Sequence, residues 1–149
     1  MTFKQKVYQH YREVLNERIK SLQKVLNDLT DSAGNETKST AGDKHETALA
    51  MLQIEQENTA RQLKEALLQK STLEKINPAL ATVSIVQGSL VKTNKGYLFV
   101  SIALGKLKVD DVNVIALSPQ SPLGAKLLGL TVSDTAEANG TQYVIEDIA

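Results

Sequence analysis

The sequence predicts an α+β protein in which two long helices precede a small β domain. Residues 3–29 carry an apolar seam with helical spacing, and residues 43–76 carry a second, looser seam. After Pro78 the apolar residues alternate with polar ones, and turn-forming residues recur at short intervals. The predicted domains are therefore a helical hairpin at 1–77 and a β domain at 78–149.

The composition excludes several classes of protein. The formal net charge is zero, whereas a protein that binds nucleic acid along its whole surface normally carries a basic excess. There are no cysteines, so neither a disulfide framework nor a thiolate zinc site is predicted. No apolar run resembles a secretory signal or reaches membrane-spanning length. We therefore expect a soluble cytoplasmic protein with no membrane partner and no tightly bound cofactor.

The first predicted helix, at residues 3–29, contains neither glycine nor proline. Its seam residues follow one another at intervals of 4, 4, 3, 4 and 3, and they are Tyr11, Leu15, Ile19, Leu22, Leu26 and Leu29. These intervals are close to the period of a coiled coil. Lys20 and Lys24 lie on this helix, where they could guide RNA or line a channel in a partner. The solvated flank of a coiled coil is the commoner role for such charges.

The second predicted helix, at residues 43–76, follows a polar link. Residues 30–42 contain Asp, Ser, Asn and Gly, whose side chains and backbone favour turns. The predicted seam of the second helix consists of Leu49, Leu52, Ala60, Leu63, Leu67 and Ile76, and Gln56 and Thr59 interrupt it. A link of this length lets the two helices fold back on each other within one chain. The sequence therefore predicts a long helical hairpin, which suits either reach or dimerisation; an antiparallel coiled coil and a monomer are what the family resemblance described below implies.

Two carboxylates, Asp43 and Glu46, lie where the second helix is predicted to begin, within an acidic tip near residues 31–46. A separation of three places two positions on one face of a helix. The same pattern also fits a capping box, in which Asp43 is the N-cap and Glu46 stabilises the first turn. The spacing alone leaves both interpretations open.

The β domain is predicted from alternating apolar residues and from two hairpin turns, Asn94–Gly96 and Asn139–Gly140. Between its strands, Ser121 is a predicted N-cap, Pro122 a first helical residue and Gly129 a helix stop. One short helix is therefore expected there. The predicted strands are residues 82–86, 89–93, 97–104, 112–117, 135–138 and 141–148.

Two stretches in this order resemble the Gre transcript-cleavage factors of bacterial RNA polymerase. The first is Gly42-Asp43-Lys44-His45-Glu46, which is similar to the tip of that family. The second begins at Ser118-Pro119 and ends at Leu127-Leu128-Gly129, which is similar to a segment of the family's C-terminal domain. The layout of a helical hairpin followed by a β domain extends the resemblance over the whole chain.

The resemblance implies a C-terminal domain of FKBP-like fold that docks on RNA polymerase, while the coiled coil enters the secondary channel. Asp43 and Glu46 would then help to hold a Mg²⁺ ion shared with the polymerase, which cleaves backtracked RNA. The protein would stimulate the polymerase's own nuclease activity, would not itself be an enzyme, and would contact nascent RNA only indirectly. Lys44 joins Lys20 and Lys24 as a candidate contact to RNA or to the channel. The family segment supplies the candidate partner-binding residues Ser118, Pro119, Ser121, Pro122, Gly124, Leu127, Leu128 and Gly129.

Two alternatives remain beside this interpretation. In the family the tip continues Glu-Asn-Ala-Glu-Tyr, whereas here Glu46 is followed by Thr47, Ala48, Leu49 and Ala50. A regulator that occupies the same channel without stimulating cleavage is therefore one alternative. A dimeric coiled-coil adaptor, whose β domain binds another protein, is the other.

Overall fold

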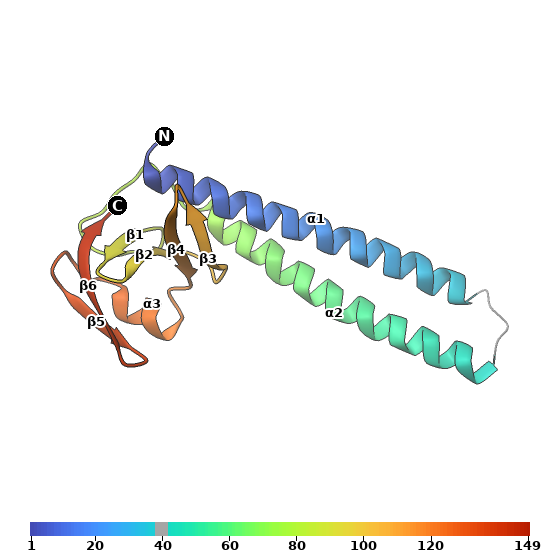
Figure 1. Ribbon diagram of the computed structural model, residues 1–149. Helices are drawn as coiled ribbons and strands as arrows, with labels where there is room; N and C mark the ends of the chain where they lie inside the picture. The colour runs from blue at the N-terminus through green and yellow to red at the C-terminus, as the bar shows by residue number, and fades with distance from the viewer. Residues whose placement is uncertain (38–41) are drawn as a thin grey trace. The chain divides into compact units, whose positions relative to one another are not determined.

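The computed structural model describes the backbone of residues 1–37 and 42–149 and the side chains of residues 1–35 and 46–149. It contains two long N-terminal helices followed by a mixed sheet, which confirms the predicted α+β class (Figure 1). The elements are α1 (Phe3–Thr37), α2 (Gly42–Glu74), β1 (Leu90–Thr93), β2 (Gly96–Val100), β3 (Gly105–Val109), β4 (Val112–Leu117), α3 (Pro122–Leu127), β5 (Thr135–Ala138) and β6 (Thr141–Ile148).

The chain divides into two compact units. One unit consists of Met1–Glu13 together with Ser71–Ala149, and the other of Val14–Lys70. The first helical turns of the chain therefore belong with the sheet. The predicted boundary between residues 77 and 78 stays a prediction.

Helix α1 is longer than the sequence predicted. The expected turn at residues 31–36 is wrong, because the helix continues through it to Thr37. Thr30 Oγ1 donates to the carbonyl of Leu26 at 2.8 Å, a bond that is compatible with helix. Turn-forming residues disfavour helix only weakly, whereas each residue added to an existing helix gains a backbone hydrogen bond. Helix α2 ends at Glu74, two residues before the predicted end.

Within the unit of residues 14–70, the two helices run side by side in opposite directions (Figure 1). The predicted seam of α1 is confirmed from Leu15 on, since Leu15 and Ile19 are buried and the following seam leucines are partly buried. Tyr11, its first predicted member, belongs instead to the unit that contains the sheet. Gln56 Nε2 on α2 donates to Thr30 Oγ1 on α1 at 3.3 Å. The pairing of the helices therefore includes a polar layer.

The seam of α2 differs from the predicted one. Ala60 and Leu67 are exposed, whereas Gln56 is partly buried and Thr59 is buried. Between residues 52 and 66, the residues that turn inward have intervals of 4, 3, 4 and 3, and they are Leu52, Gln56, Thr59, Leu63 and Ala66. The helical period determines by spacing which positions face the neighbouring helix. Two polar residues therefore occupy inward positions that hydrophobicity alone did not assign to them.

The sheet has the strand order β3-β4-β2-β1-β6-β5. Strand β2 pairs with β4 in parallel, and the other neighbouring strands pair antiparallel. The predicted hairpin at Asn139–Gly140 is confirmed, and both residues have positive φ as that turn requires. The predicted turn at Asn94–Gly96 connects β1 and β2.

Two strand predictions are wrong. Residues 82–86 form no strand, because local turns occupy them: Thr82 Oγ1 donates to Ser84 O at 2.6 Å, and the Val86 amide donates to Ser89 Oγ at 3.0 Å. The predicted strand at 97–104 ends at Val100, and a separate strand, β3, begins at Gly105 with φ of +75°. The sequence had not predicted β3.

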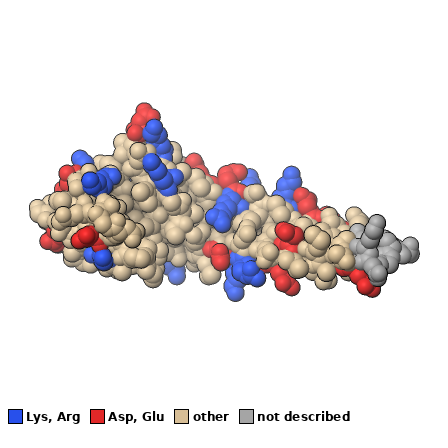
Figure 2. All heavy atoms as spheres, turned by 60° about the horizontal axis from the view of Figure 1, so that its bottom comes forward, with Lys and Arg blue, Asp and Glu red and all other residues tan. Residues whose placement is uncertain are grey.

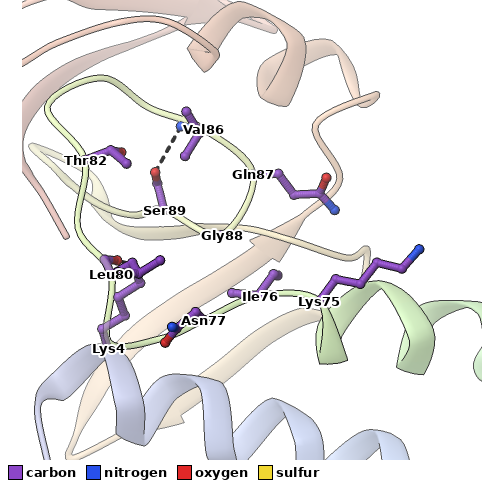
Figure 3. Close-up of a pocket in the computed structure, with 10 residues that line it drawn as sticks. All are labelled: Lys4, Lys75, Ile76, Asn77, Leu80, Thr82, Val86, Gln87, Gly88 and Ser89. Atoms are coloured by element: carbon purple, nitrogen blue, oxygen red, sulfur yellow. Dashed lines mark hydrogen bonds between the residues drawn. The ribbon is translucent and has the colours of Figure 1, made fainter.

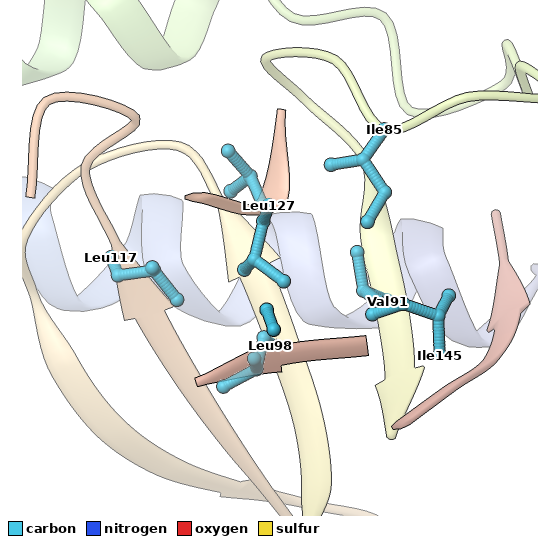
Figure 4. Packing of buried hydrophobic residues seen from close by; sticks show 8 residues of the cluster. Ile85, Val91, Leu98, Leu117, Leu127 and Ile145 are labelled. Atoms are coloured by element: carbon cyan, nitrogen blue, oxygen red, sulfur yellow. The ribbon is translucent and has the colours of Figure 1, made fainter. Parts of the chain in front are cut away.

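One face of the sheet packs around a core cluster that includes α3. Alternate residues of β2, Leu98 and Val100, point into this cluster with Val91 and Ile145 from neighbouring strands. Figure 4 shows Val91, Leu98 and Ile145 converging with Leu127 of α3, which is fully buried. The predicted short helix is therefore confirmed and closes this face of the sheet.

The opposite face of β2 meets the start of α1. The rings of Phe3 and Tyr97 lie 5.0 Å apart between centroids, and those of Tyr11 and Phe99 lie 5.9 Å apart. Tyr11 is fully buried, and its hydroxyl lies 2.7 Å from the Gly105 carbonyl oxygen and 3.0 Å from that of Val114. This phenol donates its single proton to carbonyls of the two strands β3 and β4, and so attaches the first helix to the sheet.

The Tyr11→Phe variant removes only this hydroxyl. We expect it to lower the free energy of unfolding by about 1–2 kcal/mol, because it removes a buried hydrogen bond and leaves carbonyls less well satisfied. Urea denaturation at neutral pH measures the change. Tyr8→Phe, a partly exposed tyrosine on the same helix, is the matched control and should change stability by less than about 0.5 kcal/mol.

The stabilities of the unaltered protein and of Tyr11→Phe should depend differently on pH. Burial raises the pKa of Tyr11 to about 12, above its ordinary value near 10. The folded state therefore keeps a proton that the unfolded state releases, and the resulting stability is complete below pH 10 and is lost as the pH rises towards 12. The stability difference between the unaltered protein and Tyr11→Phe should shrink over that interval. A constant difference would contradict the burial of this phenol.

Candidate functional site

The predicted acidic site lies at the start of α2, which begins at Gly42. Asp43 and Glu46 are both in this helix, three positions apart, a spacing that puts them on one face. The Glu46 side chain is exposed to solvent, and the side chain of Asp43 lies outside the described residues. Glu46 is therefore available to a partner, whereas Ser39, Thr40 and Ala41 of the same sequence stretch fall outside the described part of the chain.

The capping-box alternative required Asp43 to precede the helix as its N-cap. The helix begins one residue earlier, so Asp43 occupies a helical position and Glu46 lies beyond the third one. The backbone positions that define a capping box are therefore not those of these two acids. Their presence at the start of the helix is still favourable, because carboxylates complement its positive end.

The described side chains offer no metal centre of their own. Among the described residues, no three of His, Cys, Asp or Glu come together in a group that could hold a metal ion. One or two carboxylates do suit a Mg²⁺ ion that is held mainly by other ligands, since this ion takes oxygen donors and keeps several waters. The chemistry of the pair therefore fits a metal that a partner supplies.

The predicted basic residues lie on the helices. Lys20 and Lys24 are exposed on α1, and the side chain of Lys44 lies outside the described residues. Figure 2 shows basic and acidic side chains interspersed along the helices on the face in view. This mixed distribution is typical of the solvated side of a helix pair. It is also compatible with contacts to RNA.

The second family-like segment, 118–129, is explained largely by local structure. Ser121 Oγ donates to the Ser118 carbonyl at 2.6 Å and accepts from the Gly124 amide at 3.1 Å, which makes Ser121 the N-cap of α3. A Cβ atom at Gly124 would lie 2.0 Å from the Ser118 carbonyl oxygen. Only glycine fits that position, because backbone atoms occupy the space of any side chain.

The remaining residues of this segment separate into buried and accessible groups. Pro119 and Leu127 are buried, and Gly129 has the left-handed φ of +84° that ends the helix. Pro122 and Leu128 are exposed, Leu128 by 42% of its side chain area. Of the candidate partner-binding residues, these two present the most accessible apolar surface.

Two further features of this unit were missed by sequence reasoning. Val83 and Val132 are exposed by 85% and 50%, and they lie in segments that are joined by hydrogen bonds between Ile85 and residues 129–130. Because the alternating pattern at 82–86 predicted a strand, sequence reasoning did not identify these exposed side chains.

The second feature is the burial of Lys4. This residue lies on the same helical face as Val7 and Tyr11, at the spacing of the seam. That spacing could have predicted its burial.

No protein-family model, curated protein or solved structure matches this chain. In the described part of the chain, no helix combines the length and the apolar character needed to cross a membrane.

The Gly124→Ala variant tests the structural account of the second segment. We expect it to lower the free energy of unfolding by at least about 2 kcal/mol, because the added methyl group overlaps the Ser118 carbonyl. Ala125→Gly, at an exposed position of the same helix, is the matched control and should cost about 1 kcal/mol or less. Equal effects in thermal or urea denaturation would show that the close approach at Gly124 is unimportant.

Proposed function

We propose that this protein binds RNA polymerase, inserts its helical hairpin into the secondary channel, and promotes cleavage of backtracked RNA through Asp43 and Glu46. The single observation that carries the proposal is the position of this acidic pair at the start of a long helix, with Glu46 exposed. The protein would act as a regulator of transcription elongation, and the polymerase would perform the cleavage.

The length of the helices supports a role in reaching a buried site. Helix α2 has 33 residues, which corresponds to about 50 Å at the rise of an α-helix. We further propose that residues 14–70 form an antiparallel coiled coil, supported by the seam intervals of 4, 3, 4 and 3 along α2. A paired helix of this kind is stiff enough to hold a charged group in position within a narrow channel.

The chemistry of the acidic pair supports a shared metal. A second Mg²⁺ in a polymerase active centre stabilises the attacking and leaving oxygens of phosphodiester cleavage. Asp43 and Glu46 would hold that ion through carboxylate oxygens, and Glu46 is free of burial that would oppose its charge. The protein's contribution would be to position these oxygens.

We propose that the β domain has an FKBP-like fold and provides the docking surface on RNA polymerase. Its mixed sheet with one short helix on one face is compatible with that fold. Exposed apolar side chains, including Pro122, Leu128, Val83 and Val132, offer a surface for protein contact. Large apolar groups left in contact with water commonly mark such interaction sites.

A non-cleaving regulator on the same scaffold is the second candidate. The residues after Glu46 favour it, because Thr47, Ala48, Leu49 and Ala50 replace the Asn, Glu and Tyr of the family's tip. Such a protein would occupy the channel and compete with cleavage factors. Its acids would then influence the polymerase without accelerating RNA cleavage.

Charge removal at the tip tests the proposed function. In a stalled, backtracked polymerase complex at fixed Mg²⁺, we expect the unaltered protein to accelerate transcript cleavage. The acceleration by Asp43→Asn/Glu46→Gln should be at least about tenfold smaller. The matched control is Glu55→Gln/Glu57→Gln, which removes two exposed charges from the same helix and should retain activity.

The outcomes separate the two candidates. Equal activity of the tip variant and the unaltered protein would contradict the metal role of the acids. Absence of any acceleration, combined with competition against a known channel-binding cleavage factor, would support the non-cleaving regulator. A protein that neither accelerates cleavage nor binds polymerase would contradict both.

The dimeric adaptor makes a separate prediction about oligomeric state. Among the side chains described at residues 14–35 and 46–70, six large apolar ones are exposed and could pair between chains: Val14, Val25, Met51, Ile54, Leu67 and Leu68. However, the hydrogen bond between Thr30 and Gln56 and the buried seam already pair the helices within one chain. We therefore expect a monomer in sedimentation equilibrium across a hundredfold range of concentration. A dimer at all concentrations would favour the adaptor.

A further inference from the structure

A pocket of about 280 Å³ lies beside the start of α1, within the unit that contains the sheet. It is formed by Lys4 of α1, by residues 75–77 at and after the end of α2, and by the segment from Leu80 to Ser89 (Figure 3). This volume is at the lower end of the range for small-molecule sites. The pocket is remote in sequence from Asp43 and Glu46, and its ligand does not depend on the proposed function.

Lys4 is the buried cationic group of this pocket. Its side chain is only 7% exposed, and its Nζ donates to the carbonyl of Leu80. No Asp or Glu is among the described residues that line the pocket, and two lysines, Lys4 and Lys75, are. An ammonium group has three N–H donors, so Lys4 has donors to spare for a ligand.

Burial of this ammonium is unfavourable without a counter-charge. It lowers the pKa of Lys4 below its ordinary value, because the charged form has lost solvent. A buried charge is normally paired or well hydrogen-bonded, and the single described partner here is an uncharged carbonyl. An anion bound next to Nζ would supply the missing charge.

Ser89 adds a second buried donor to the same pocket. The residue is 1% exposed, and its Oγ accepts a hydrogen bond from the Val86 amide at 3.0 Å, as Figure 3 shows. That bond uses a lone pair of the hydroxyl and leaves its proton to be donated. The polar part of the pocket therefore combines a cation with a hydroxyl donor, which suits a negatively charged acceptor.

The rest of the lining is apolar where Ile76, Leu80 and Val86 contribute their side chains. We propose that this pocket binds a small carboxylate with a short apolar body, whose oxygens accept from Lys4 Nζ and Ser89 Oγ. The aliphatic wall favours such a ligand over inorganic phosphate, which would leave these apolar side chains uncovered.

Titration of the full chain with hexanoate tests this assignment. We expect saturable changes in the amide NMR signals of Val86, Gly88 and Ser89, with binding at least tenfold weaker for hexan-1-ol, which lacks the charge, and for phosphate, which lacks the apolar body. Lys4→Met keeps the aliphatic stem and should weaken hexanoate binding at least tenfold. Lys95→Met removes the same charge from an exposed turn and should leave binding unchanged.

A second measurement keeps the proposal testable if Lys4→Met does not fold. In the unaltered protein, the side-chain NMR signals of Lys4 report its pKa, which hexanoate should raise and hexan-1-ol should not. Absence of saturable binding, equal binding of hexan-1-ol, equal binding of phosphate, or full binding by a folded Lys4→Met variant would each overturn the assignment.

Discussion

The buried hydroxyl of Tyr11 constrains how the first turns of α1, within residues 1–13, lie on the sheet. A phenol that is removed from water needs a hydrogen-bond partner, and here the partners are carbonyls of Gly105 and Val114 on adjacent strands. The ring also packs against Phe99, so both its polar and its apolar parts have defined neighbours. Because these contacts hold one residue of α1 in place, they also determine where the preceding helical turns meet the sheet.

The burial of Lys4 follows from that placement. Residues 4, 7 and 11 lie on one helical face. Because Tyr11 on this face is buried in the core, Lys4 on the same face is buried at the margin of the core. The long aliphatic stem of lysine tolerates this position, and its ammonium reaches the Leu80 carbonyl. A buried cation here is a consequence of helix geometry, and it makes the adjacent pocket suitable for an anion.

The segment at 118–129 is constrained mainly by the local fold. Ser121 and Gly124 are required by the helix cap and by close backbone contact, and Leu127 by the core. Only the side chains that remain exposed, such as Leu128, are available to a partner. The acidic pair differs, because its place in α2 is not that of a capping box, and Glu46 remains open to solvent.

The sequence by itself determined the two long helices, the cap and stop of α3, and the hairpin before β6, because spacing and turn chemistry act between residues close together in the chain. It also indicated the acidic pair as a candidate site. Only the tertiary structure decided that α1 continues to Thr37, that Gln56 and Thr59 occupy the helical seam, that 82–86 is not a strand, and that β3 exists. That Lys4 lines a pocket was also decided there, although helical spacing already places residue 4 on the face of Val7 and Tyr11. Strand pairing and burial depend on partners that are distant in sequence, which local patterns do not specify.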